Sequence, residues 1–294
     1  MNLTFDDIYL EDAVVVAGQL EGSGPLKAYF DSVDECKDCC FENSEIDLLS
    51  KAMDMLFEKT ERTCDQIDLA IGGELSNQLA TTSYTLRKLP ISLIGIYSAC
   101  STIALGLITA GLSLSQSSVR RVLVFTSSHN QSAERQFRNP VEYGGAKEDT
   151  QTFTATIGAT CFLSHEKSPI RLSSVTVGKV VDVGFTDSMD YGRAMMPAAL
   201  ETLLEHFKTT ATTPADYDLV LTGDLSRFGS KLVQQELEKE FGPVCNYQDC
   251  GLMLYDIDRQ DVLAGGSGPG TSAAVLLSYV RKKMTERAFK RVLL

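Results

Sequence analysis

The chain has 294 residues, of which 44% are hydrophobic, so it can bury one large α/β core or two smaller ones. Its formal net charge of −12 excludes nucleic acid and anionic membrane as general partners. The first residues show no signal-peptide pattern, and eight cysteines in such a chain favour a reducing compartment. We therefore expect an intracellular protein with free thiols.

Short apolar runs alternate with helical patterns through the first half of the sequence. Strands are expected at 13–17, 67–71, 91–97, 119–126 and 153–164, and helices at 43–57, 77–88 and 101–116. The run at 91–97 is predicted to be a buried strand, and a long polar connection is predicted between 127 and about 150. Strands that alternate with helices indicate an α/β protein with a parallel sheet.

The second half of the sequence repeats the first. Residues 218–226 (DLVLTGDLS) match residues 68–76 (DLAIGGELS) at five of nine positions, with an offset of 150. Residues 290–293 (KRVL) match 120–123 (RRVL) at an offset of 170, and at the same offset 270–274 falls opposite 100–104. Three matches in the same order indicate two pseudo-symmetric halves, which we place at 1–168 and 169–294.

The remaining segments of the second half are fitted around this repeat. A strand is expected within 170–183, a helix at 189–207, a hairpin within 242–264 and a second apolar helix at 273–280. The chain ends inside the segment that matches 119–126, so the last strand of the second half is expected to be missing. His206 is expected at the surface of its helix.

Cys100 occupies the most informative position in the sequence. It follows an apolar strand and a turn of small residues, and it opens the apolar helix at 101–116. Unpaired backbone N–H groups and the helix dipole favour a thiolate at such a place. A strand, a small turn and a cysteine at a helix start form the arrangement that displays a thiol nucleophile in α/β enzymes.

A duplicated strand–helix unit with this cysteine resembles the thiolase superfamily, which includes the ketoacyl synthases. The resemblance implies a five-layered αβαβα fold, in which two sheets enclose one central helix from each half. The chain-initiating ketoacyl synthases pair the cysteine with a His and an Asn of the second half. The matching positions here are Gly223 and Gly270. Because glycine offers neither a base nor an oxyanion donor, we expect Cys100 to be a vestigial nucleophile and the protein not to be an enzyme.

A closer resemblance covers nearly the whole chain. The block 127–145 (SSHNQSAERQFRNPVEYGG), together with 99–102, 221–226, 246–252 and 264–268, is similar to the stage V sporulation protein AD family of spore-forming bacteria. Membership would imply a non-catalytic protein that binds dipicolinate (pyridine-2,6-dicarboxylate), as its calcium chelate, for uptake into the developing spore. It would also imply a peripheral location at the spore inner membrane, with the proteins of the dipicolinate channel as partners.

The sequence places candidate ligand-binding residues at one edge of the predicted sheet. The turn before Cys100 and the connection after 126 both follow parallel strands, so they are expected to face one cleft. The connection carries cationic or neutral donors and aromatic rings that suit a flat dicarboxylate. The predicted set is Cys100, Ser101, His129, Arg135, Phe137, Arg138, Tyr143, Lys147, Asp224 and Gly268.

Some of these residues also have a structural interpretation. Arg135 and Arg138 lie near Glu134 and Glu142 and would equally form a surface ion-pair cluster or a dimer interface. Phe137 would anchor the connection to the core. The spacing of Cys36, Cys39 and Cys40 suits half of a zinc site, but no second pair follows, so we predict no metal site and no cofactor beyond calcium carried by the ligand.

Two rival functions remain open. The first is a residual acyl-transfer enzyme with Cys100 as the nucleophile and His129 as its base. The second is a pure scaffold for a membrane transport complex. By resemblance to the ketoacyl synthases, which join their third strands, we also expect a homodimer formed through the apolar strand at 91–96.

Overall fold

The first half of the chain builds a mixed sheet. The computed structural model describes residues 1–37, 40–137 and 147–294. Along the larger sheet the strands run β3-β2-β8-β6-β4-β5, and β9 also pairs with β2. Their bounds are β2 (Tyr9–Ala17), β3 (Ser32–Val33), β4 (Leu69–Gly73), β5 (Leu93–Gly95), β6 (Arg121–Ser128), β8 (Ile157–Ser164) and β9 (Ile170–Arg171). Strands β4, β5 and β6 are parallel, whereas β8 is antiparallel to β2 and β6.

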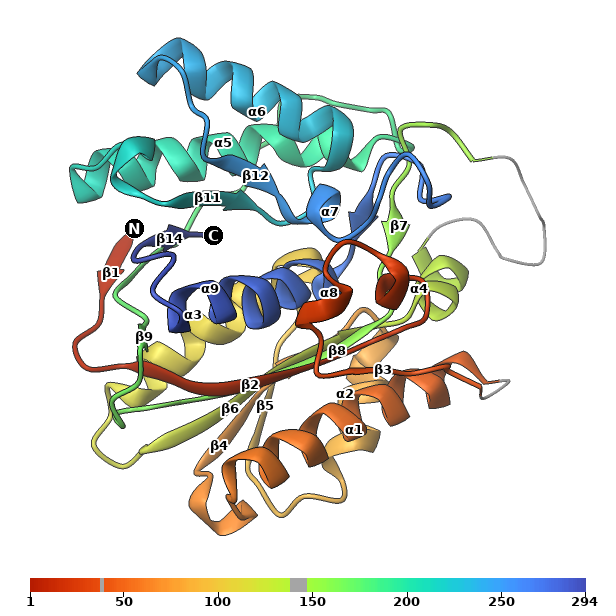
Figure 1. The fold of residues 1–294 in the computed structure, drawn as a ribbon, viewed down its shortest axis with the longest axis vertical. Helices are drawn as coiled ribbons and strands as arrows, with labels where there is room; N and C mark the ends of the chain where they lie inside the picture. Colours follow the sequence, from red (N-terminus) through yellow and green to blue (C-terminus); the bar gives the residue numbers. More distant parts are fainter. Residues whose placement is uncertain (38–39, 138–146) are drawn as a thin grey trace.

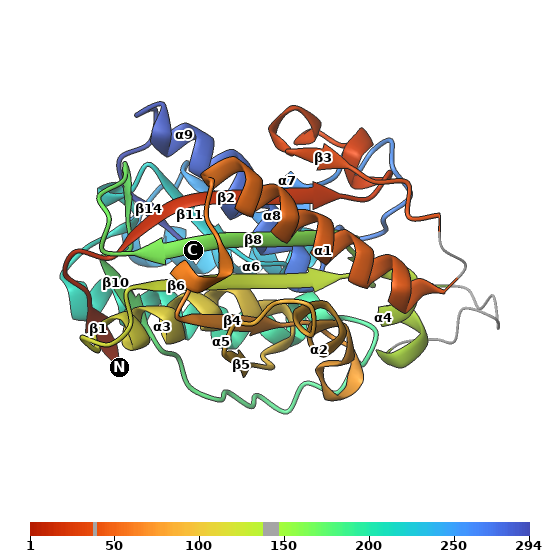
Figure 2. The same cartoon turned by 90° about the horizontal axis from the view of Figure 1, so that it is seen from below.

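Helices cover both faces of this sheet. The helices α1 (Phe41–Thr60) and α2 (Ala80–Leu86) lie on the outer face, and α3 (Thr102–Leu114) lies on the inner face (Figures 1 and 2). Helix α1 is amphipathic, and its stripe of Leu48, Leu49, Met53 and Leu56 is buried against the sheet. This apolar stripe fixes α1 across β2 and β8 (Figure 2).

The second half adds a smaller sheet, an outer helical layer and one helix of the central layer. The strands β12 (Tyr247–Asp249), β11 (Leu219–Thr222) and β14 (Val292–Leu293) are parallel, with β11 in the middle. The helices α5 (Tyr191–Thr210) and α6 (Ser226–Phe241) cover its outer side. The inner side faces one continuous helix made of α8 (Pro269–Ala274), the π-helical segment η8 (Val275–Val280) and α9 (Arg281–Thr285).

Figure 1 therefore shows five layers, with α3 and the α8–α9 helix between the two sheets. The predicted αβαβα architecture is confirmed. The smaller sheet has no counterpart of β8 among the described residues. Short elements join the halves: β1 (Asn2–Thr4) pairs with β10 (Ser174–Thr176), and β7 (Phe153–Thr154) pairs with β13 (Gly266–Ser267). The boundary at 168/169 stays a prediction.

The same carboxylate contact recurs in both halves and supports the repeat found in the sequence. Oδ2 of Asp68 accepts hydrogen bonds from the backbone N–H groups of Arg120 and Arg121, at 2.7 and 3.1 Å. Oδ2 of Asp218 accepts from the N–H groups of Lys290 and Arg291, at 2.6 and 2.9 Å. In each half, an aspartate before one strand thus fixes the start of its parallel neighbour.

Several local predictions were wrong. The apolar run at 91–97 forms a three-residue strand at the edge of the sheet, where Ile94 is 41% exposed. Helix α3 is not buried all round, because Leu112 is 47% exposed. The segment 242–264 contains the parallel strand β12 and helix α7 (Cys250–Met253) instead of a hairpin. His206 is buried, and its ring contacts Thr176 and Tyr217.

No helix in the described ranges combines the length and the apolar character that crossing a bilayer requires.

Glu45 is a buried acid that fixes α1 to the end of β6. Its carboxylate accepts hydrogen bonds from Ser127 Oγ at 2.8 Å and Ser132 Oγ at 3.0 Å. Burial, together with the nearby charge of Glu74, raises the pKa of Glu45 to about 7. The folded protein therefore keeps a proton on this group at pH values where the unfolded chain has lost it.

This shift predicts a pH dependence of stability. A raised carboxyl pKa makes the free energy of unfolding fall as the pH rises from about 4.5 to about 7. Glu45→Gln should reduce that fall by about 1–3 kcal/mol, because it removes the titrating group and keeps its shape. Urea unfolding at pH 5 and pH 8 measures the effect. Glu58→Gln, at an exposed position of the same helix, is the control; an identical pH dependence in both variants would contradict the assignment.

Candidate functional site

Cys100 lies in a tight turn between β5 and α3. The preceding residue, Ala99, has a φ of +44°, which L-residues rarely adopt. Two bonds of Thr102 hold the turn: its Oγ1 donates to Ala99 O at 2.7 Å and accepts from Ser98 N at 3.3 Å. Cys100 is half-buried in the short 3-10 turn Ala99–Ser101, directly before α3 begins at Thr102, which agrees with its predicted place at the opening of this helix.

The second half meets this turn through α8. Ser272 Oγ donates to Cys100 O at 3.4 Å. Gly270, the counterpart of Cys100, donates its N–H to Ser128 Oγ at 3.3 Å, and Ser128 Oγ donates to Ala155 O at 2.6 Å. A Cβ at position 270 would lie 2.6 Å from Ser128 Oγ and 2.7 Å from Ile157 Cβ. There is no space for an asparagine at this position.

Gly223 presents the opposite situation. A Cβ at this position would have Ser272 Cβ, at 3.8 Å, as its nearest neighbour. A Cβ at position 223 therefore meets no clash, whereas one at position 270 does. Both positions at which the resemblance implies catalytic partners of Cys100 carry glycine, and only position 270 is crowded by its neighbours.

Asp224 and Gly268 are brought together beside this region. Asp224 is buried, and its Oδ2 accepts the N–H of Gly268 at 3.0 Å. Gly268 has a φ of +89°, and a Cβ there would lie 3.0 Å from Thr154 Cγ2, so glycine is required on both counts. The contact ties the end of β11 to the start of α8.

Asp249 is a buried acid that the sequence did not single out, although it lies in the NYQDCGL segment. Its carboxylate accepts hydrogen bonds from Thr222 Oγ1 at 2.7 Å and from the N–H groups of Leu225 and Ser226, both at 2.9 Å. Burial and the nearby Asp224 charge raise the pKa of Asp249 to about 7. Because its oxygens are held by the turn after β11, its role is to shape that turn.

His129 does not face Cys100. Its ring stacks on Phe41 of α1, with 5.8 Å between ring centroids, and lines a cavity of about 300 Å³ next to the turn that follows β2. The neighbouring Ser128 points to the other face, toward α8, as the alternation of strand side chains requires. Burial lowers the pKa of His129 to about 4, so the imidazole is neutral at pH 7.

Two of the predicted cations are already paired. Arg135, on α4 (Asn130–Phe137), lies 2.7 Å from Glu42 Oε1 and stacks over the Phe41 ring. Lys147 Nζ lies 3.2 Å from Glu134 Oε2. The ion-pair interpretation of Arg135 is thus observed, with Glu42 as the partner. Arg138, Tyr143 and the side chain of Phe137 lie outside the described residues.

Ser101 is the last residue of the predicted set, and it lies at the same edge of the larger sheet. Ser101 follows Cys100, and its Oγ donates to Ser98 O at 2.9 Å. The Gln136 side chain of α4 accepts the N–H of Asn77, at 3.1 Å, in the turn after β4. Strand β4 lies between β5 and β6, so the Cys100 turn and α4 share the carboxyl edge but do not follow adjacent strands. As a ligand-binding set, these residues stay a prediction.

The site therefore offers a thiol at a helix start, hydroxyls from Ser128 and Ser272, and a buried carboxylate from Asp224. His129 lies on the far face of the sheet. Within the described ranges, no group of three or more His, Cys, Asp or Glu residues is placed to hold a metal ion. The hydroxyls of Ser128 and Ser272 already donate to the carbonyls of Ala155 and Cys100, and the site has no imidazole beside the thiol.

Comparison with solved structures identifies the fold as thiolase-like. The cerulenin-bound OleA of Xanthomonas campestris superposes with a TM-score of 0.64 at 13% identity, covering 95% of this chain and 90% of that one. The 3-oxoacyl-(acyl carrier protein) synthase III (FabH) of Xanthomonas oryzae pv. oryzae gives a TM-score of 0.60 at 13% identity, covering 96% and 93%. At this identity the likeness concerns the fold alone.

Sequence relatives identify the family. The model of the family "Stage V sporulation protein AD (SpoVAD)" matches residues 3–294. The stage V sporulation protein AD of Bacillus subtilis (strain 168) is 42% identical over 289 residues, which are 97% of this chain and 85% of that protein. The chain belongs to the stage V sporulation protein AD family, and the predicted resemblance is confirmed.

The packing at Gly270 generates a prediction about stability. Gly270→Ala should destabilise the protein by about 1–3 kcal/mol, because the added methyl group overlaps Ser128 and Ile157. Gly223→Ala is the matched control, and it should change the free energy of unfolding by less than about 0.5 kcal/mol. Urea denaturation of both variants measures the difference. Equal losses would mean that position 270 is not the crowded one.

Proposed function

We propose that this sporulation protein is non-catalytic and binds dipicolinate, as its calcium chelate, for uptake into the developing spore. The proposal rests on the observation that no catalytic partner is placed beside Cys100 among the described residues. The place of one catalytic partner is filled by Ser128 and Ile157, the place of the other holds Gly223, and His129 faces away. Membership of a sporulation family also supports a role in spore formation.

The carboxyl edge of the larger sheet is the proposed binding region. Arg135 is the cation there whose planar group suits a carboxylate, and its pairing with Glu42 is half-exposed. Exposed ion pairs contribute about 1 kcal/mol or less, so exchanging Glu42 for a ligand carboxylate costs little. The acid Asp224 follows β11 of the smaller sheet and binds Gly268, which lies near Ser128 at the end of β6; calcium bound to the ligand would offset its charge. In this proposal the calcium arrives with the ligand.

Calorimetry with the full chain tests the proposal. Dipicolinate, titrated with and without equimolar calcium, should bind saturably, and Arg135→Gln should weaken binding about tenfold or more, because a hydrogen bond to a charged group is lost. Cys100→Ala should bind as the wild type does. Lys239→Gln, which removes an exposed cation on α6, is the control. No heat at millimolar dipicolinate, with or without calcium, would refute the small-molecule part.

Residual acyl transfer is the second candidate, because Cys100 keeps its place at the start of α3 after a strained residue. Incubation with acyl thioesters, followed by intact-mass analysis, distinguishes an acyl-transfer enzyme from a binding protein. A stable adduct that disappears in Cys100→Ala would favour the enzyme over the binding protein. If neither ligand nor acyl donor binds and channel proteins are still captured in a pull-down, the scaffold alternative is favoured, with a peripheral place at the spore inner membrane.

We also propose a homodimer joined through β5. This strand ends the sheet, and the apolar side chains of Leu93, Ile94 and Leu112 are exposed beside it. An apolar, unpaired edge strand favours pairing with another strand. Ile94→Lys should shift the protein to a monomer in light scattering after gel filtration. Val180→Lys, at an exposed apolar position outside the sheet, should not. A wild-type protein that is monomeric at high concentration would refute the dimer.

A further inference from the structure

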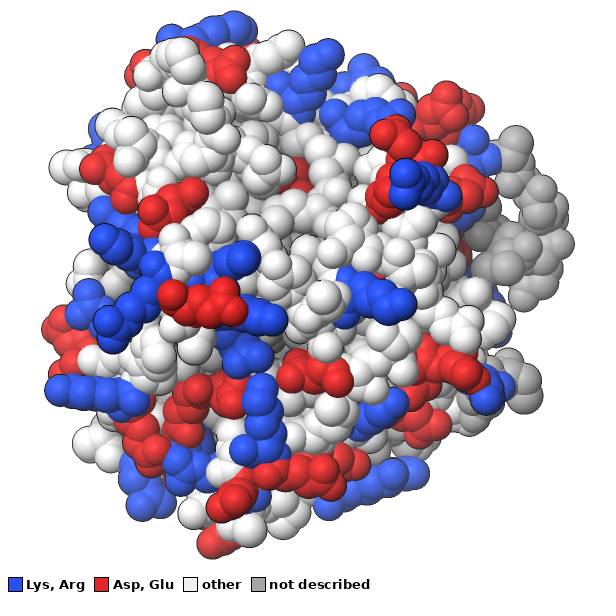
Figure 3. Space-filling model, in the orientation of Figure 1, with Lys and Arg blue, Asp and Glu red and all other residues white. Residues whose placement is uncertain are grey.

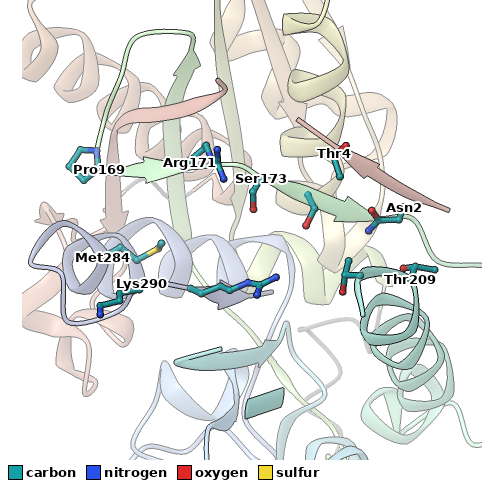
Figure 4. Close-up of a pocket in the computed structure, with 11 residues that line it drawn as sticks. Asn2, Thr4, Pro169, Arg171, Ser173, Thr209, Met284 and Lys290 are labelled. Atoms are coloured by element: carbon teal, nitrogen blue, oxygen red, sulfur yellow. The ribbon is translucent and has the colours of Figure 1, made fainter. Parts of the chain in front are cut away.

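A polar cleft lies at the opposite edge of the smaller sheet from Asp224. It has a volume of about 560 Å³ and lies between β1, the β9–β10 segment, the end of α5 and residues 284–291. Figure 4 shows Arg171 and Ser173 on one wall, with Lys290, Met284 and Thr209 on the facing wall. The described lining includes three cations, Arg171, Lys290 and Arg291, and no Asp or Glu.

The cleft lies where positive charge gathers on an acidic protein. The whole chain has a net charge of −12, but residues 281–291 contain six Lys or Arg residues and one acid, Glu286. Figure 3 shows that basic side chains gather on the side of the molecule where Figure 1 places α9 and β14. A local basic surface of this kind attracts anions despite the overall charge.

The internal repeat shows how unusual these cations are. Lys290 and Arg291 correspond to Arg120 and Arg121 at the offset of 170, and both pairs are held by an aspartate through their backbone N–H groups. In the first half, acids neutralise the Arg121 side chain: Glu11 Oε1 lies 2.6 Å from Nε, and Glu166 Oε1 lies 2.5 Å from Nη2.

In the second half, the corresponding arginine contacts a tyrosine where Arg121 contacts two acids. The guanidinium of Arg291 lies over the Tyr217 ring, 4.5 Å from its centroid, and donates to Tyr217 Oη at 3.4 Å. No salt bridge of Arg291, Lys290 or Arg171 is found within the described ranges, although Arg291 interacts through its charge with Asp216, and Lys290 with Asp218. The Asp218 carboxylate is held mainly by the two backbone N–H groups. The same scaffold position thus carries an arginine bound by two acids in one half and an arginine that contacts a tyrosine in the other.

We propose that this cleft is a binding site for a phosphate group. Guanidinium groups match phosphate oxygens in a bidentate way, and an ammonium adds a point charge. The hydroxyls of Thr4 and Ser173 line the same cavity and supply further donors. The phosphate belongs either to a free phosphate compound or to a phospholipid headgroup. The site is separate from the carboxyl edge at which dipicolinate is proposed to bind.

Calorimetry with inorganic phosphate, on the full chain at constant ionic strength, tests the site. Phosphate should bind saturably in the millimolar range or tighter, and the double variant Lys290→Gln/Arg291→Gln should bind at least tenfold more weakly. The backbone N–H contacts to Asp218 survive these substitutions, so the double variant should fold. Arg120→Gln, at the symmetry-related position in the first half, is the matched control and should bind phosphate as the wild type does.

Flotation with vesicles separates the two sources of phosphate. If the site takes a lipid headgroup, the protein should float with phosphatidylglycerol vesicles but not with phosphatidylcholine vesicles, and the double variant should lose this property. If it takes a free compound, inorganic phosphate binds in calorimetry and neither vesicle retains the protein. Absence of binding to both probes, or equal phosphate binding by the wild type and the double variant, would overturn the proposal. Dipicolinate binding that survives in the double variant keeps the two sites distinct.

Discussion

The close approach of α8 to the larger sheet at Gly270 is the contact on which the arrangement of the molecule depends. Ser128 Oγ donates to the carbonyl of Ala155 and accepts the N–H of Gly270, so one hydroxyl links the end of β6, the turn before β8 and the central helix. Only a residue without Cβ permits this distance. The approach also brings Ser272 to the Cys100 turn. The packing that joins the two halves therefore uses the position at which a ketoacyl synthase has its asparagine.

The two halves share a scaffold and differ in what they place on it. Asp68 and Asp218 make the same backbone contacts, and the strands that follow occupy corresponding places in their sheets. The side chains around them differ in charge. Glu11 and Glu166 surround Arg121, whereas Tyr217 is the partner of Arg291. A duplicated fold thus lets the two copies of one position have different side-chain partners.

Much of the architecture could be predicted from the sequence because the repeat carries long-range information. The matches at offsets of 150 and 170 place β4 opposite β11, β6 opposite β14 and Cys100 opposite Gly270, and the structure agrees. Local patterns were less informative. An apolar run such as 91–97 has the same appearance in a central and an edge strand, because burial depends on which strands pair beside it. Helix α4 was hidden in a polar connection, whose amphipathic pattern is too short to recognise.

The candidate site was harder to predict for a geometric reason. Side chains alternate between the two faces of a strand, so an uncertain strand end leaves the face of His129 undetermined. The partner of Arg135 is Glu42, which is 93 residues away in the sequence and comes from another layer, so no local pattern could indicate it. The buried Asp249 lies in a short polar strand that resembles a loop. Its importance is visible only from the N–H groups that converge on it.

The carboxyl edge of the larger sheet and the cleft beside β14 differ in the partners of their cations. This difference determines how each region would bind an anion. At the carboxyl edge of the larger sheet, Arg135 and Lys147 already have acidic partners, so a ligand must replace an existing pair. Selection there depends on geometry, such as the planar fork of a guanidinium facing a flat dicarboxylate. In the cleft beside β14, the described lining holds three cations and no Asp or Glu, so the proposed binding would depend on charge density. Salt at about 0.1 M largely screens exposed charges that are more than about 10 Å apart, so binding that depends on the summed charge of this cleft should be the more sensitive of the two to ionic strength.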